Sequence, residues 1–196
     1  MFKLILTALL LLCVVYPSET ALAQEDRGLT GTFNRDYFWA VNQTNYWRGL
    51  ATSDVVTNHI NPAANYIARG DYARAKRELE FVLTRFVNHP QALVLVGMVA
   101  RGNKDSAWGM RNFERALGLY PEYALTHAQY GRFLVDLGQL NDGIQRLKHA
   151  LEMDPKLAAG YEWLASAYTK IGEVELARET RERAQSLGLG GKTAER

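Results

Sequence analysis

Cysteine is nearly absent from this chain: Cys13 is the only one, and it lies in an apolar run near the start. An intrachain disulfide is therefore excluded, and a folded domain must be stabilised by its apolar core. Proline is scarce, with 5 in 196 residues, and the charges nearly cancel at +2. This balance gives no electrostatic reason to expect a nucleic-acid or anionic-membrane binder. With 47% hydrophobic residues, the chain is too apolar to be disordered.

A long membrane-spanning run is also missing at the start of the chain. The apolar stretch Leu4–Tyr16 is shorter than the roughly 20 residues of a spanning helix, and small residues follow at Ala21 and Ala23. This pattern predicts a secretory signal peptide over 1–23, cleaved before Gln24, with no membrane insertion afterwards. The alternative is an uncleaved anchor. The Ala-Leu-Ala-Gln junction is typical of bacteria, which predicts the periplasm.

The usual signatures of catalysis are missing as well. Residues 24–196 contain no thiol, and no match occurs to His-Glu-x-x-His, Gly-x-Ser-x-Gly or a phosphate loop. The histidines, which lack zinc-ligand spacing, are His59, His89, His127 and His149. We therefore expect no enzyme activity, metal or cofactor. Most aromatic residues are predicted to be core, whereas Tyr120 and Tyr123 flank a proline turn and are expected near the surface.

A repeat of 34 residues organises most of the chain. Small residues keep this interval in two series: Ala63, Gly97, Gly131 and Ala165, and Ala75, Gly109, Gly143 and Ala177. The resulting units are 56–89, 90–123, 124–157 and 158–191, and each contains two stretches with helical apolar spacing separated by a turn. Glycine inside a helix costs about 1 kcal/mol relative to alanine. We therefore expect these positions to allow two helices to approach closely.

The boundaries of the helices follow from local signals. In the third unit, Gly138 breaks the apolar stripe and Pro155 ends the second helix. In the first unit, Asn61 is predicted to cap a helix that begins near Pro62 and ends at Arg69. Residues 54–60 are then a separate turn or a kinked extension.

The motif within the units resembles the tetratricopeptide repeat. The third unit carries it at Tyr130, Gly131, Leu134, Gly143, Leu147, Ala150 and Pro155, and the second at Val96, Gly97, Phe113, Ala116 and Pro121. Val87 departs from it by replacing a proline, and Arg181 by replacing a large apolar residue. The resemblance implies an all-α fold, an α-solenoid of about four helical hairpins whose first helices line a concave groove. Exported members commonly serve envelope, pilus, secretion or cytochrome assembly.

The resemblance also places particular residues in that groove. They are Ile60, Ala64, Ile67, Val94, Met98, Arg101, Leu125, Ala128, Arg132, Glu162, Ser166 and Thr169. Their mainly apolar character with two arginines implies a protein or peptide partner with an apolar segment. The Lys and Asn types that clamp a terminal carboxylate in some relatives are missing, so a chaperone-tail receptor is not expected. The alternative is that residues 33–50 of the same chain fill the groove.

The segment that precedes the repeats, 24–55, is rich in aromatic residues. These are Phe33, Tyr37, Phe38, Trp39, Tyr46 and Trp47, and a short helix is predicted over Asp36–Leu50. The segment is interpreted as a cap over the first unit or as an arm that binds a partner or a second copy. Residues 192–196 are predicted to be a flexible tail. The sequence thus favours a non-catalytic scaffold or assembly factor in the periplasm, with a self-associating structural subunit, and hence a homo-oligomer, as the alternative.

Overall fold

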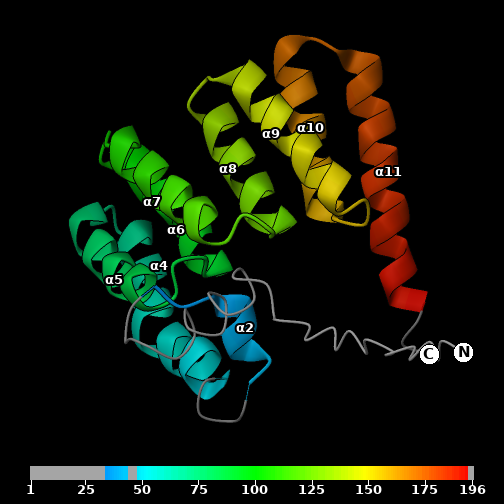
Figure 1. Cartoon of the computed structure of the whole chain (residues 1–196). Helices are drawn as coiled ribbons and strands as arrows, with labels where there is room; N and C mark the ends of the chain where they lie inside the picture. Colours follow the sequence, from blue (N-terminus) through cyan, green and yellow to red (C-terminus); the bar gives the residue numbers. More distant parts are fainter. Residues whose placement is uncertain (1–33, 44–47, 194–196) are drawn as a thin grey trace, which may run out of the picture.

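The computed structural model describes residues 34–43 and 48–193. The predicted signal peptide, together with Phe33, Tyr46 and Trp47, lies outside these residues. In the described part, pairs of antiparallel helices stack side by side from the N-terminal to the C-terminal end (Figure 1). The predicted all-α solenoid fold is therefore confirmed.

The helices recur with the interval that the sequence shows. The hairpins are α4 (Asn61–Ala68) with α5 (Tyr72–Arg85), α6 (Pro90–Gly102) with α7 (Ser106–Leu119), α8 (Ala124–Asp136) with α9 (Leu140–Met153), and α10 (Ala158–Ile171) with α11 (Val174–Thr193). Successive second helices thus begin 34 residues apart. Helix α11 continues to Thr193, so the tail predicted from residue 192 is wrong at its first two positions. Glycine lowers helix propensity without blocking a helix, which allows α11 to pass Gly190 and Gly191.

A left-handed residue ends the first helix of each hairpin. Gly70, Gly138 and Gly172 have φ angles of +76°, +85° and +83°. In the second hairpin the same position is occupied by Lys104, with φ of +55°. The turn therefore keeps its phase, but a residue with a Cβ adopts a conformation that glycine adopts without steric cost.

We expect Lys104→Gly to raise the free energy of unfolding by about 1 kcal/mol, because it removes this steric cost. Chemical denaturation followed by circular dichroism measures the change. Lys104→Ala is the matched control, since it removes the charge and keeps the Cβ. Equal stability of the two variants would contradict the explanation.

The segment before α4 differs from the prediction in two ways: its first helix is shorter, and residues 50–60 are helical up to α4. Helix α2 (Tyr37–Val41) ends far short of Leu50, so the helix predicted over 36–50 is wrong in extent. The π-helical segments η1 (Leu50–Asp54) and η2 (Val56–Ile60) then lead directly into α4. Asn61 is therefore inside a helical run and not its cap. A wide π turn before Pro62 relieves the contact between the proline ring and the carbonyl four residues back.

The N-terminal segment packs onto the repeats as a cover. Arg35 pairs with Phe86 through backbone hydrogen bonds, from Arg35 N to Arg85 O at 2.7 Å and from Val87 N to Arg35 O at 3.2 Å. Ala40, Ala51 and Val55 are fully buried in the same core as the first two hairpins. This cover therefore contributes to the core at the N-terminal end of the stack.

Two tyrosines hold this cover in place. Tyr120 is 1% exposed, and its hydroxyl donates to the Asn34 carbonyl at 2.8 Å. The expectation that Tyr120 lies near the surface is thus wrong. Tyr123 is partly buried, and its hydroxyl donates to the Asp36 carboxylate. That carboxylate also accepts from the Asn88 amide at 2.8 Å. These polar contacts, which the repeat pattern does not contain, explain the burial of both rings.

The repeated small residues lie where backbones or rings approach closely. A Cβ on Gly143 would lie 2.8 Å from the Gly131 carbonyl oxygen, and one on Gly131 would lie 2.9 Å from the Gly143 carbonyl oxygen. The Phe133 ring occupies the space where a Cβ on Gly109 would be, 2.4 Å from that position. The predicted packing role of these glycines is confirmed.

A candidate protein-docking groove

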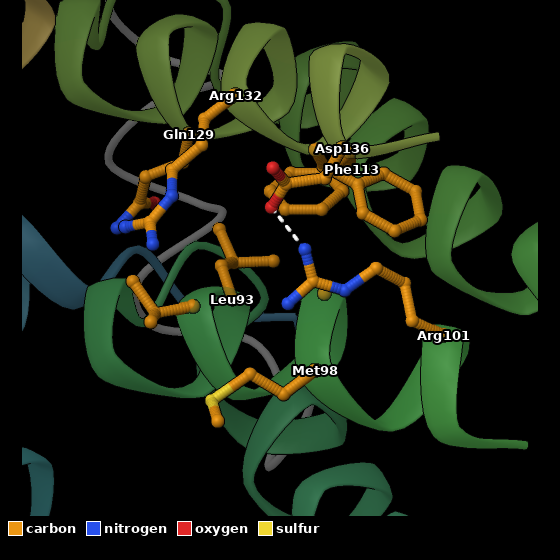
Figure 2. A pocket seen from close by; sticks show the side chains of 10 residues that line it. Leu93, Met98, Arg101, Phe113, Gln129, Arg132 and Asp136 are labelled. Atoms are coloured by element: carbon orange, nitrogen blue, oxygen red, sulfur yellow. Dashed lines mark hydrogen bonds and ion pairs between the residues drawn. The ribbon is translucent and has the colours of Figure 1, made fainter. Parts of the chain in front are cut away.

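An apolar pocket lies between helices α6 and α8, with Phe113 of α7 at its base. Its lining residues are Leu93, Val94, Gly97, Met98, Arg101, Phe113, Gln129, Arg132, Phe133 and Asp136. The volume is about 50 Å³, several times the roughly 10–15 Å³ that one water needs. Figure 2 shows α6 and α8 facing each other across this space. We call it the α6–α8 pocket.

The rim on α6 is apolar and exposed. Val94, Met98 and Arg101 follow one another at helical spacing, so they share one face of α6. Val94 is 38% exposed and Met98 41% exposed, among the most exposed large apolar side chains of the described chain. Below them, Leu93 and Phe113 are buried and form the base. The pocket therefore offers apolar surface that water contacts in the free protein.

The wall on α8 contains a buried amide. Gln129 is 5% exposed, and its Nε2 donates to the Pro90 carbonyl at 2.9 Å. Its Oε1 is buried and has no hydrogen-bond partner among the described residues. A buried acceptor without a donor costs free energy.

The charges around the pocket are mostly positive. The guanidinium of Arg101 pairs with the Asp136 carboxylate across the pocket (Figure 2), and the Lys170 ammonium lies 3.5 Å from the same carboxylate. The Arg132 guanidinium lies 5.2 Å from the centre of the Trp163 ring. Within the described residues, Arg132 makes no ion pair with a carboxylate. Two cations thus face the Asp136 carboxylate, and a third cation, Arg132, lines the same pocket.

The structure divides the residues that were placed in the groove from the sequence. Val94, Met98, Arg101 and Arg132 line the pocket. Ala64, Glu162, Ser166 and Thr169 are exposed, and Ile67 and Leu125 are partly exposed, but none of these six lines it.

Two of the predicted groove residues are core residues. Ile60 is 5% exposed and Ala128 is 0% exposed, so their assignment to the groove is wrong. Both share the phase of Val94, which is exposed. Ile60 packs among residues of the N-terminal core, and Ala128 packs with the cluster that contains Leu164 and Tyr168 of the next hairpin. Equal phase in the repeat therefore does not mean equal exposure.

Gln129 and Asp136 were missed by the sequence reasoning. Asp136 stands one turn after Arg132, a spacing that places both on one face of α8. Gln129, like Thr126 and His127, is a polar residue in a run of α8 that is almost entirely buried. Such a residue is a signal for a buried hydrogen bond, although the sequence does not show which partner it takes.

The aromatic residues of the N-terminal segment lie elsewhere. The Phe38 ring stacks on Tyr123 with 4.3 Å between centroids, the Tyr37 ring lies 4.5 Å from His89, and Trp39 packs against the core. None of the residues 34–43 or 48–50 lines the α6–α8 pocket. The described part of this segment therefore does not fill the α6–α8 pocket.

The histidines have structural surroundings. His89 is fully buried at the start of α6, where Nδ1 accepts from the Ala92 backbone at 3.4 Å and Nε2 lies 3.2 Å from the Ala51 carbonyl. Burial lowers the pKa of His89 from 6.5 to about 4. His127 lies near His149, with 4.9 Å between ring centroids, and burial lowers its pKa as well.

The described residues contain no cluster of three or more His, Cys, Asp or Glu side chains suited to a metal. A second, polar hollow is lined by Leu134, Asp142, Gln145, Arg146 and His149. None of the helices between residues 34 and 193 combines the length and apolarity needed to cross a membrane.

Comparison with known proteins points to one family. A family model for the tetratricopeptide repeat matches residues 131–188. Hsc70-interacting protein 1 of Drosophila melanogaster is 33% identical over 102 residues, which are 48% of this chain and 27% of that protein. The TPR repeat-containing thioredoxin TTL4 of Arabidopsis thaliana is 31% identical over 81 residues, 41% of this chain and 12% of that protein. The chain thus spans about a quarter or less of these relatives.

Solved structures share the fold. A crystal structure of MamA matches with a TM-score of 0.51 and 16% identity, covering 74% of this chain and 85% of that one. PilF of Pseudomonas aeruginosa matches with a TM-score of 0.53 and 20% identity, covering 69% and 62%. Residues 131–188 thus match the tetratricopeptide repeat model, and the helical hairpins repeated every 34 residues have the same fold as these solved structures.

Proposed function

We propose that this chain is a non-catalytic interaction scaffold or assembly factor that binds a segment of a partner protein at the α6–α8 pocket. The observation that carries the proposal is the apolar rim of that pocket, where Val94 and Met98 are exposed above buried Leu93 and Phe113. Exposed apolar side chains beside a concave site are typical of docking surfaces for partner helices and extended segments.

The relatives support a protein-binding role. One of them is named for its interaction with Hsc70. The partner itself does not transfer to this chain, because the match covers 27% of that protein. In addition, Val94 and Met98 occupy the groove in place of the Lys and Asn types of a terminal-carboxylate clamp.

The periplasm is the proposed location. The support is the pattern of residues 1–23, with a short basic start, an apolar run and small residues before Gln24. Self-association through the N-terminal aromatic segment has less support, because Tyr37, Phe38 and Trp39 pack on their own chain.

We expect the double variant Val94→Glu and Met98→Glu to lose its partner while keeping its helical content. Two carboxylates at the rim would have to be desolvated by an apolar segment, which opposes binding. The measurement is affinity capture from envelope extract with quantitative mass spectrometry, beside circular dichroism of each protein.

Val174→Glu is the matched control, since Val174 is 70% exposed at the far end of the stack. It is expected to capture the same proteins as the wild type. If the double variant captures them equally well, the partner does not bind at the α6–α8 pocket and the proposal is wrong.

A further inference from the structure

We infer that the α6–α8 pocket recognises a partner segment in which an aliphatic side chain is followed closely by an aspartate or glutamate. This inference rests on the proposed function, because it assigns the chemistry of the partner that binds at the same site. Three features of the pocket support it: its size and lining, the unpartnered oxygen of Gln129, and the cation at Arg132.

The aliphatic side chain follows from the pocket itself. The volume of about 50 Å³ exceeds the requirement of one water several times, and the base is formed by Leu93, Phe113 and Phe133. Burial of apolar surface in such a space is favourable, and a Val- or Leu-sized group is compatible with its size. A charged group at the base would be desolvated without a partner.

The unpartnered oxygen points to the backbone of the segment. Gln129 is 95% buried, since its exposed fraction is 5%, and its amide nitrogen is occupied by the Pro90 carbonyl. That hydrogen bond fixes which end of the amide is held by α6. The remaining Oε1, without a partner among the described residues, accepts one N–H. A backbone N–H next to the aliphatic residue supplies this donor.

The carboxylate follows from the charges at the rim. Arg101 and Lys170 both form ion pairs with Asp136, so a single carboxylate is shared by two cations. Arg132 lies on the same helix and lines the same pocket, and its described contact is the face of Trp163. An acidic side chain from the partner complements this excess of positive charge and pairs with the guanidinium of Arg132.

The acidic group is placed within the segment and not at its end. The apolar rim, Val94 and Met98, is on α6, whereas Arg132 is on α8 across the pocket. A segment that contacts both rims passes across the pocket. Val94 and Met98 stand in place of the Lys and Asn types that clamp a terminal carboxylate, so we assign the carboxylate to a side chain.

The test uses a phage-displayed library of random 12-residue peptides, fused so that no peptide has a free C-terminus. The purified protein is the target, and the selected peptide is then synthesised with a fluorophore for anisotropy measurements. We expect enrichment of an aliphatic residue with Asp or Glu within three positions. Binding is expected to weaken as salt is raised, because the paired charges are screened.

Four variants separate the features of the pocket. Arg132→Glu is expected to weaken binding more than tenfold, and to be rescued when the peptide's acidic residue is replaced by lysine. Arg111→Glu makes the same charge change at an exposed residue outside the pocket and is expected to have no effect. Gln129→Met keeps the approximate shape, removes the acceptor together with the hydrogen bond to the Pro90 carbonyl, and is expected to weaken binding about tenfold. The Val94→Glu, Met98→Glu double variant is expected to abolish binding.

The outcomes distinguish failure of the proposed function, docking at the pocket, from failure of this inference about the partner's chemistry. If the double variant abolishes binding while Arg132→Glu and Gln129→Met bind within twofold of the wild type, docking at the pocket stands and this inference is overturned. A selected motif without an acidic residue overturns it as well. If no peptide is enriched, or if the double variant binds like the wild type, the proposed function fails and the inference with it.

Discussion

The Gly143→Ala variant is expected to unfold with a free energy about 3 kcal/mol lower than that of the wild type, although alanine is the better helix former. The added Cβ would lie 2.5 Å from Val135 Cγ2, 2.8 Å from the Gly131 carbonyl oxygen and 2.9 Å from the Val135 nitrogen. Two of these atoms are backbone, so no rotamer change relieves the contact. Helices α8 and α9 must separate, and their packing against each other is lost in part.

The control for this prediction is Gly118→Ala. Gly118 is also inside a helix, α7, but a Cβ there would meet nothing within 4 Å. This variant is expected to gain up to about 1 kcal/mol, because alanine restricts the unfolded chain and favours the helix. Urea unfolding of both variants measures the difference. A Gly143→Ala protein as stable as the wild type would show that the hairpin does not need close backbone contact at this point.

The second expected result is a loss of about 2 kcal/mol in the free energy of unfolding between pH 7 and pH 5, attributable to His89. The pKa of His89 is about 4 in the folded protein, because burial disfavours the charged ring. In the unfolded chain, where the ring is not buried, the pKa is 6.5. Between these values the unfolded chain binds more protons than the folded chain. The free energy of unfolding therefore falls as the pH falls through this range.

The geometry around His89 explains why protonation is resisted. Its Nδ1 accepts from the Ala92 backbone at the first turn of α6, and a protonated Nδ1 is unable to do so. Its Nε2 donates to the Ala51 carbonyl in η1. The ring therefore connects the N-terminal cover to the second hairpin, and it does so in the neutral form.

The control for the pH prediction is His89→Asn, measured by urea unfolding at both pH values. Asparagine is a good helix cap and does not titrate. The variant is expected to be less stable than the wild type at pH 7 but to depend less on pH. A smaller dependence remains from His127, whose pKa is also lowered by burial. If the wild type and the variant lose the same free energy between pH 7 and pH 5, His89 is not the cause.

The helical hairpins could be predicted from the sequence because the residues that determine them are close together in the chain. Amphipathic spacing, small residues and turn residues recur every 34 positions, and they act on neighbours in the same hairpin or the adjacent one. The turn at Lys104 illustrates this: glycine is missing there, yet the left-handed residue stands in phase with Gly70 and Gly138. The flanking helices impose the conformation, and the side chain bears the cost.

The residues that line the groove could not be predicted from their position in the repeat alone. Ile60, Val94 and Ala128 occupy the same place in successive units, but only Val94 is exposed. Ile60 is covered because the N-terminal segment adds to the core beside it, and Ala128 is covered by the following hairpin. In contrast, Met98 and Arg132 share a phase that is exposed in every unit. Exposure therefore depends on what lies next to each unit, which the repeat pattern does not specify.

The sequence by itself determined the helical hairpins, their 34-residue period and the small residues between them, because those features arise from contacts a few turns apart. Only the tertiary structure decided how the N-terminal segment is held and where the pocket lies. The contact from Tyr123 to Asp36 spans 87 residues, and that from Gln129 to Pro90 spans 39. Such pairs leave no periodic trace, since each occurs once and depends on the stacking of the units.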